Sequence, residues 1–247
     1  MKVSHMLALG AATIVAAVCA MGGFALAAFP NFSDCPISSG GICVDVQSQS
    51  GEINIKGFRV PLDHSLEIRG ALVEGRFVPP TGTNGFFAQP VNVPGGVLGI
   101  ELPISLNLVT ATAELAGPAS SIQLEPGQLN ISMPIKLHLS NPLIGSSCYI
   151  GSNSSPVRMN LITGTTSPPP PNRPISGHLG EFSFVPPNIG VIRGNLDVDN
   201  SFSIPSASGC GLLGILNPLI NLKLGLPSSA GHNATSIAND LAIETRF

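Results

Sequence analysis

The feature that most constrains the fold of this chain is an alternation of apolar and polar residues, with a period of two, along most of its length. The clearest run is residues 99–108 (GIELPISLNL), and residues 128–139 (QLNISMPIKLHL) alternate with little interruption apart from Pro134. Side chains point alternately to the two faces of a β-strand, so this period predicts strands with one buried and one solvated face. The alternating runs are 52–60, 65–73, 99–108, 110–115, 121–124, 128–139, 157–162, 176–185, 190–204 and 236–247.

Turn-forming residues separate these runs, as at positions 79–82 (PPTG) and 125–127 (EPG). Pro103 and Pro134 fall inside strand patterns, which predicts edge strands or bulges there. Helical periodicity is scarce, and residues 212–220 (LLGILNPLI) are consistent with one short helix or with buried chain beside Cys210. The predicted fold is therefore all-β, an antiparallel β-sandwich with Greek-key-like connections and at most one or two short helical turns after the leader.

The N-terminus has the order of a secretory signal. Lys2 precedes an uncharged apolar run at residues 6–20, and Ala25-Leu26-Ala27 places small residues where a signal peptidase cleaves. We expect residues 1–27 to form a helical signal peptide, residues 28–50 an N-terminal disulfide loop segment, and residues 51–247 a single β domain. An uncleaved anchor helix is the alternative reading, because the stretch is long enough to span a bilayer.

Four cysteines remain after cleavage, because Cys19 lies in the leader. An even number of cysteines in an exported chain predicts two disulfides, for which three connectivities exist. We favour Cys35–Cys43, which closes a short Gly/Ser loop, together with Cys148–Cys210, whose loop of 62 positions contributes about 4 kcal/mol in the chain-entropy model. The only site residues that the sequence predicts are therefore the four disulfide cysteines, Cys35, Cys43, Cys148 and Cys210.

Composition excludes some partners. Only Lys2 among the eleven Lys and Arg residues lies in the leader, and the fourteen Asp and Glu residues all follow it, so the mature net charge is −4. A weakly acidic chain without a basic run has no electrostatic attraction for nucleic acid. The absence of Trp and the single Tyr count against carbohydrate binding. No other apolar stretch is long enough to span a membrane.

Candidate catalytic groups are few. The mature histidines are His64, His138, His178 and His232, and no G-x-S-x-G sequence occurs, although a dispersed Ser–His–Asp triad remains an alternative. Asp197-Val198-Asp199-Asn200 alternates oxygen ligands as a calcium loop does, but it lacks the glycine and glutamate of an EF-hand, so we interpret it as an exposed strand end. The sequence predicts no catalytic residue, cofactor or metal site, and the balance is against an enzyme.

Three phrases surround the later cysteines: residues 141–152 (NPLIGSSCYIGS), residues 163–168 (TGTTSP) and residues 208–211 (SGCG). In these the chain resembles a recurring group of actinobacterial exported proteins of unknown function. The resemblance covers roughly residues 141–231 and implies the pairing Cys148–Cys210 and a bacterial envelope setting. It implies no activity or cofactor.

These observations favour a secreted or cell-surface protein that is not an enzyme, with a structural or interaction role and with cell-envelope components or other surface proteins as partners. A carrier of a small apolar ligand is the alternative, with residues 212–226 lining its cavity. A secreted hydrolase is the third hypothesis.

Overall fold

The computed structural model of the chain describes residues 28–96, 106–118, 121–125 and 127–247. The predicted signal peptide lies outside the described residues, as does most of the run 99–108. The described residues form fifteen strands, with one 3-10 turn, η1 (Leu212–Gly214), and one helix, α1 (Asn217–Leu224). The strands are β1 Gly41–Ile55, β2 Phe58–Pro61, β3 Leu66–Val73, β4 Arg76–Val78, β5 Phe86–Ala88, β6 Val91–Asn92, β7 Thr110–Leu115, β8 Ser121–Glu125, β9 Gln128–Asn141, β10 Gly145–Ile150, β11 Val157–Ile162, β12 Glu181–Val185, β13 Ile189–Asp199, β14 Ala207–Ser208 and β15 Asn233–Arg246.

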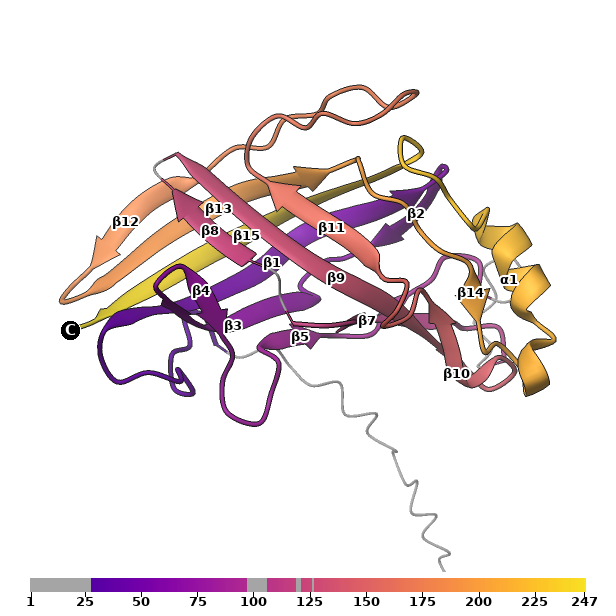
Figure 1. Ribbon diagram of the computed structural model, residues 1–247, viewed down its shortest axis with the longest axis horizontal. Helices are drawn as coiled ribbons and strands as arrows, with labels where there is room; N and C mark the ends of the chain where they lie inside the picture. Colours follow the sequence, from indigo (N-terminus) through magenta and orange to yellow (C-terminus); the bar gives the residue numbers. More distant parts are fainter. Residues whose placement is uncertain (1–27, 97–105, 119–120, 126) are drawn as a thin grey trace, which may run out of the picture.

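The described strands belong to one hydrogen-bonded sheet with the order β14-β10-β9-β11-β13-β15-β1-β3-β4, and β2, β5, β6, β7, β8 and β12 pair beside this path. The pairings between these strands are antiparallel, which confirms the predicted all-β class. The sheet curls over itself, so that β9 and β11 lie across β1 and β15 (Figure 1). One apolar core fills the space between the two halves, as in a sandwich.

Strand β9 shows why alternation produces this core. Leu129, Ile131, Met133 and Ile135 occupy alternate positions, and each is less than a tenth exposed. The strand is central, and its register with β11 is continuous through Pro134, so neither the edge strand nor the bulge that this proline predicted is present. Pro134 is tolerated because it lies where one neighbour of β9 changes from β7 to β8. Ala116 N, between these two strands, donates to Pro134 O at 2.9 Å. The edge of Pro134 that lacks an N–H therefore faces the gap between β7 and β8, where no strand needs this donor.

The run 52–60 is not one strand, as the alternation suggested, but the hairpin of β1 and β2. Lys56 and Gly57 both have positive φ, 49° and 92°, and Asn54 Oδ1 accepts a hydrogen bond from Gly57 N at 2.7 Å. Two such residues form the tight turn that matches the twist of a two-stranded ribbon. The apolar phase changes at the turn, from Ile55 to Phe58, and this was the missed signal.

Two predicted runs are shorter in the structure. Within 176–185, only β12 is a strand, whereas Ser176 and His178 make isolated bridges. The run 190–204 ends with β13 at Asp199. Strand β1 passes through position 50, so residues 41–50 lie in the same sheet as the rest of the chain.

Candidate functional site

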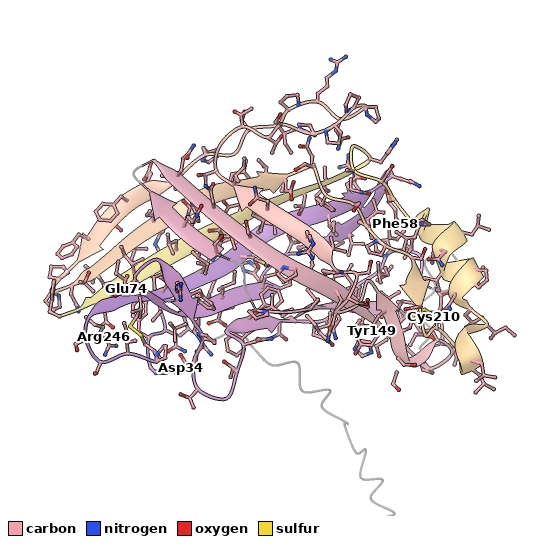
Figure 2. All side chains as sticks on the ribbon, in the orientation of Figure 1. Asp34, Phe58, Glu74, Tyr149, Cys210 and Arg246 are labelled. Carbon is pink, nitrogen blue, oxygen red and sulfur yellow. A yellow bond between two sulfur atoms is a disulfide. The ribbon has the colours of Figure 1, made fainter. Side chains whose placement is uncertain are left out.

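Both predicted disulfides are present. Cys148 on β10 is bonded to Cys210, with Cα atoms 4.2 Å apart and both residues fully buried. Cys35 is bonded to Cys43 on β1, with a Cα separation of 5.8 Å. Figure 2 shows Cys210 at the α1 end of the molecule, and Asp34 beside a disulfide towards the opposite end. Two disulfides are typical of proteins that fold in an oxidising compartment.

The α1 end carries an unusual concentration of exposed aliphatic side chains. Three segments meet there: Asn141 Nδ2 donates to the carbonyl oxygens of Leu106 and Leu108, and Gly211 N donates to Ile144 O at 2.6 Å. Figure 1 shows α1 at the extreme of the long axis, away from the C-terminus. Eight side chains of these described segments, each about half to almost fully exposed, form what we call the apolar tip: Leu106, Leu108, Leu143, Leu212, Leu213, Ile215, Leu219 and Leu222.

Helix α1 presents Leu219 and Leu222 to solvent because the side-chain amides of its asparagines face the protein. Asn221 Oδ1 accepts from Ala207 N at 2.7 Å, and Asn217 Oδ1, one helical turn earlier, accepts from Cys210 N at 2.9 Å. Ile220 and Leu224 are buried, whereas Leu222 is 82 % exposed. The polar contacts of the helix are therefore used for attachment to the edge strand β14, which leaves apolar surface outside.

Leu213 is the most exposed member of the apolar tip, at 99 %. Its backbone is left-handed, with φ 55° and ψ 22°, a conformation that is uncommon for a residue other than glycine, asparagine or aspartate. Both the strain and the exposure of a leucine cost free energy, and such costs concentrate at functional positions.

Charge is almost absent around the apolar tip. Residues 106–113, 137–157 and 200–231 contain one Lys, Arg, Asp or Glu between them, Lys223. The chain just after α1 is held by Lys56, at the β1–β2 turn, whose Nζ donates to Gly225 O at 2.7 Å and Pro227 O at 3.1 Å. Together with the Cys148–Cys210 disulfide, these contacts hold the segment rigidly on the sheet.

The carrier hypothesis placed a cavity along residues 212–226, and the structure places most of these apolar side chains in solvent. Leu212, Leu213, Ile215, Leu219 and Leu222 are exposed. Leu224 does line a small cavity of about 40 Å³, but its other walls come from the sheet. The segment is mainly a surface.

The histidines lie in separate environments. His138 on β9 stacks on Tyr149, with ring centroids 4.7 Å apart, and its Nδ1 is 3.7 Å from Glu114 Oε1. His178 forms a hydrogen bond with the neighbouring Leu179 O, and His64 occupies a turn with φ 46°. The contacts found for these three residues do not join them to a serine nucleophile. Within the described ranges, no group of three or more His, Cys, Asp and Glu residues has the arrangement of a metal site.

Asp197 and Asp199 are buried, which corrects the prediction of an exposed strand end. Asp199 Oδ2 accepts from Asn160 N at 2.7 Å, and its Oδ1 accepts from Ser201 Oγ at 2.7 Å, so this carboxylate connects β13 to β11. Asp197 instead lies inside the curled sheet, next to Asn239 of β15. Burial raises the pKa of Asp197 to about 6, and the hydrogen bond from Asn239 lowers it in part.

Sequence reasoning also missed a polar cluster on the outer face of β1 and β3. Asp45, Gln47 and Glu67 are buried there under the N-terminal segment, and Asn31 N donates to Asp45 Oδ2 at 2.7 Å. Desolvation raises the pKa of Asp45 to about 7; Glu67 acts in the same direction, whereas Arg69 and the hydrogen bonds from Asn31 and Gln47 oppose it. Alternation had predicted a solvated face here, because a covering loop leaves no periodic signal.

Comparison of the chain with protein-family models, curated proteins and solved structures finds no match. The helix that the structure describes is too short to cross a bilayer, and the described residues include no helix that is long and apolar enough to do so. The fold and the apolar tip define the molecule as a disulfide-bonded antiparallel β protein with an exposed apolar end.

Proposed function

We propose that this chain is an exported protein of the cell surface that is not an enzyme, and that it attaches to a lipid layer of the cell envelope through the apolar tip. The observation that carries this proposal is the near-complete exposure of Leu212, Leu213 and Leu222 at one end of the long axis. Contiguous apolar surface on a folded protein marks an interaction site. The signal at residues 1–27 and the two disulfides support export.

The chemistry of the apolar tip favours lipid over a protein partner. Hot spots of protein interfaces are enriched in Trp, Tyr and Arg, and leucine is under-represented there. The apolar tip consists of exposed Leu and Ile side chains, and its helix α1 lies at one end of the long axis (Figure 1). Such aliphatic side chains enter the acyl region of a lipid layer, where each buried leucine contributes about 1.5–3 kcal/mol.

The partner surface is expected to be neutral or zwitterionic. Basic residues attract anionic lipid at about 1 kcal/mol each, and Lys223 alone carries a positive charge in the segments of the tip. The mature chain has a net charge of −4, which opposes binding to an anionic surface. Attachment is therefore driven by apolar burial and depends little on salt.

The test is co-sedimentation of the mature protein with phosphatidylcholine vesicles. We expect binding, no gain when phosphatidylglycerol is added, and a loss of about a hundredfold in the Leu213→Asn, Leu222→Gln double variant, since two leucines lose at least about 1.5 kcal/mol each. Asparagine tolerates the left-handed backbone at position 213, and glutamine is a good helix former at position 222, so the variant should fold.

The matched control is Phe184→Ser, which removes exposed apolar surface from β12, towards the other end of the molecule. This variant should bind vesicles as the unmodified protein does. Absence of vesicle binding, or equal losses in both variants, would contradict the proposal. Dimers that form without lipid and disappear in the double variant would assign the apolar tip to a second copy of the chain instead.

A further inference from the structure

Strand β12 forms an edge of the curled sheet, towards the end away from α1 (Figure 1). It pairs with β13 over all five of its residues and with no other strand in the described part of the chain. Each of these five residues is exposed, so the second side of β12 is open to solvent. An open strand edge offers unpaired backbone N–H and C=O groups, which can pair with a strand of another chain.

The hydrogen bonds of β13 determine which backbone groups of β12 point to this open edge. Thr245 N donates to Asn188 O at 3.2 Å, so the even-numbered residues from Asn188 to Ile192 face β15. Hydrogen-bonding groups alternate between the two sides of a strand, and the odd-numbered residues of this part of β13 therefore face β12, where they oppose odd-numbered residues. The backbone groups of Phe182 and Phe184 consequently point away from β13, to the open edge.

The side chains of Phe182 and Phe184 share one face of β12, and they are 66 % and 58 % exposed. The ring of Phe182 packs against the backbone of β13, because a Cβ atom added to Gly190 would lie 3.0 Å from Phe182 Cε2. Edge strands are commonly protected by charged side chains, and Glu181 is the one charge of β12. Two largely exposed aromatic rings at an open edge therefore mark an interaction surface.

The sequence of β12 (EFSFV) fits a second copy of itself, because a phenylalanine stands on each side of Ser183. When two β12 strands run antiparallel with Ser183 opposite the partner's Ser183, Phe182 lies opposite the partner's Phe184, and the same pair recurs across the symmetry axis. These are the residues whose N–H and C=O groups point outward, so both pairs exchange backbone hydrogen bonds and bring their rings side by side.

Other arrangements of the two strands satisfy fewer groups. A shift of two positions in either direction leaves one aromatic pair in place of two, and in one direction it sets Phe182 opposite Pro186, which has no N–H. A parallel arrangement in register sets Glu181 beside the partner's Glu181, and like charges at adjacent positions are destabilising. The antiparallel pairing about Ser183 is therefore favoured.

We propose that two copies of this chain form a symmetric dimer through their β12 strands, which joins the two curled sheets into one continuous sheet. The interface is self-complementary and closed, so pairing through β12 stops at two copies. Its short strands place it at the low end of interface sizes, below about 1,200 Å², where transient complexes are found. The apolar tip lies towards the other end of the molecule and takes no part, so the dimer does not depend on lipid attachment.

Sedimentation equilibrium of the mature protein without lipid tests the dimer. We expect monomers at about 5 μM and a dimer fraction that rises towards about 500 μM, as for a transient interface. Phe184→Ser should weaken association at least about tenfold, because each dimer loses both aromatic pairs. The double variant of the apolar tip, Leu213→Asn with Leu222→Gln, is the matched control and should associate as the unmodified protein does. Monomers alone over this range would overturn the proposal.

Cross-linking tests the register. Ser183→Cys places a thiol opposite the partner's own, in a pair without mutual backbone hydrogen bonds, whose Cα atoms are about 4.5 Å apart and so within reach of a disulfide. Val185→Cys is the matched control, since it is exposed on the same face of β12 but lies about 13 Å along the strand from its counterpart. The other four cysteines of the mature protein are already paired, so each variant has one free thiol.

Under mild oxidation, covalent dimers should form at least about tenfold faster from Ser183→Cys than from Val185→Cys. Equal rates would place the contact elsewhere and overturn the proposal, as would association of Phe184→Ser as tight as that of the unmodified protein. The sedimentation of the unmodified protein needs no variant, so it decides even if a substitution disturbs folding.

Discussion

Asp45 is buried against the N-terminal segment with one oxygen, Oδ2, accepting from Asn31 N, while Oδ1 has no partner in the part of the chain that the structure describes. Glu67 lies close enough to raise its pKa further, although the Arg69 guanidinium, 3.2 Å from Glu67 Oε1, offsets part of this repulsion. A carboxyl group in this position is more stable when it is protonated. The folded protein therefore holds a proton near neutral pH that the unfolded chain has already released.

This proton gives the stability a definite pH dependence. The folded-state pKa values of Asp45 and Asp197, about 7 and about 6, lie above the ordinary value of 3.8. The contribution of both groups to the free energy of unfolding is thus fully present below pH 3.8. It is lost as the pH rises through their folded-state pKa values. We expect Tm to fall between about pH 4 and pH 7, as measured by calorimetry.

Asp45→Asn provides the check at the residue scale. Above pH 6 the remaining slope belongs mainly to Asp45, so the variant should show a nearly constant Tm from pH 6 to pH 8 and exceed the unmodified protein at pH 8. A Tm that rises with pH in the unmodified protein, or an unchanged slope in the variant, would refute this assignment.

At the scale of elements, the attachment of η1 and α1 to β14 and β10 determines which side chains of the apolar tip are exposed. The Cys148–Cys210 disulfide joins the segment just before η1 to β10, the strand that pairs with β9. Asn217 and Asn221 add hydrogen bonds along the same edge. The position of the exposed leucines thus depends on covalent and polar contacts, because their own side chains pack little against the core.

Removal of this disulfide should be more costly than removal of the other. The Cys148–Cys210 loop of 62 positions contributes about 4 kcal/mol in the chain-entropy model, and the Cys35–Cys43 loop of 8 positions about 2.5 kcal/mol. The double variant Cys148→Ser, Cys210→Ser should therefore unfold at lower urea concentration than Cys35→Ser, Cys43→Ser. The reverse order would mean that holding the N-terminal segment over Asp45 stabilises the protein more than attaching η1 and α1 to the sheet does.

Several elements were predictable because local pattern alone determines them. The alternating runs 110–115 and 157–162 coincide with β7 and β11, since each strand has one face on the core. The hairpin at Lys56 was missed because a two-residue turn is so short that the alternation seemed continuous. Short-range pattern thus gives strands more reliably than it gives their ends.

The candidate sites were less predictable, because long-range contacts create them. The apolar side chains of residues 212–220 would suit either core or surface. What exposes them is the hydrogen bonding of Asn217 to Cys210 and of Asn221 to Ala207, 7 and 14 residues earlier. Asp197 looked like an exposed strand end because polar side chains usually are, and its inward position depends on the register of β13 against β15. A single sequence contains neither of these contacts as a pattern.

At the scale of the whole molecule, the curled sheet separates two ends. The apolar tip and Cys210 lie at one end of the long axis, whereas Asp34, Arg246 and the C-terminus lie towards the other (Figure 2). A rigid sheet of long strands such as β1 and β9 connects the two. Attachment through the apolar tip would therefore leave most of the polar surface of the protein facing away from the lipid layer.

The most direct measurement of this attachment uses the absence of tryptophan from the chain. Leu222→Trp places one fluorophore in the apolar tip, and Phe182→Trp places one on β12, towards the other end. With phosphatidylcholine vesicles, we predict a blue shift for Leu222→Trp and quenching by lipids brominated on the acyl chains, with neither effect for Phe182→Trp. An emission spectrum of Leu222→Trp that vesicles leave unchanged would contradict the account, as would an equal shift at both ends.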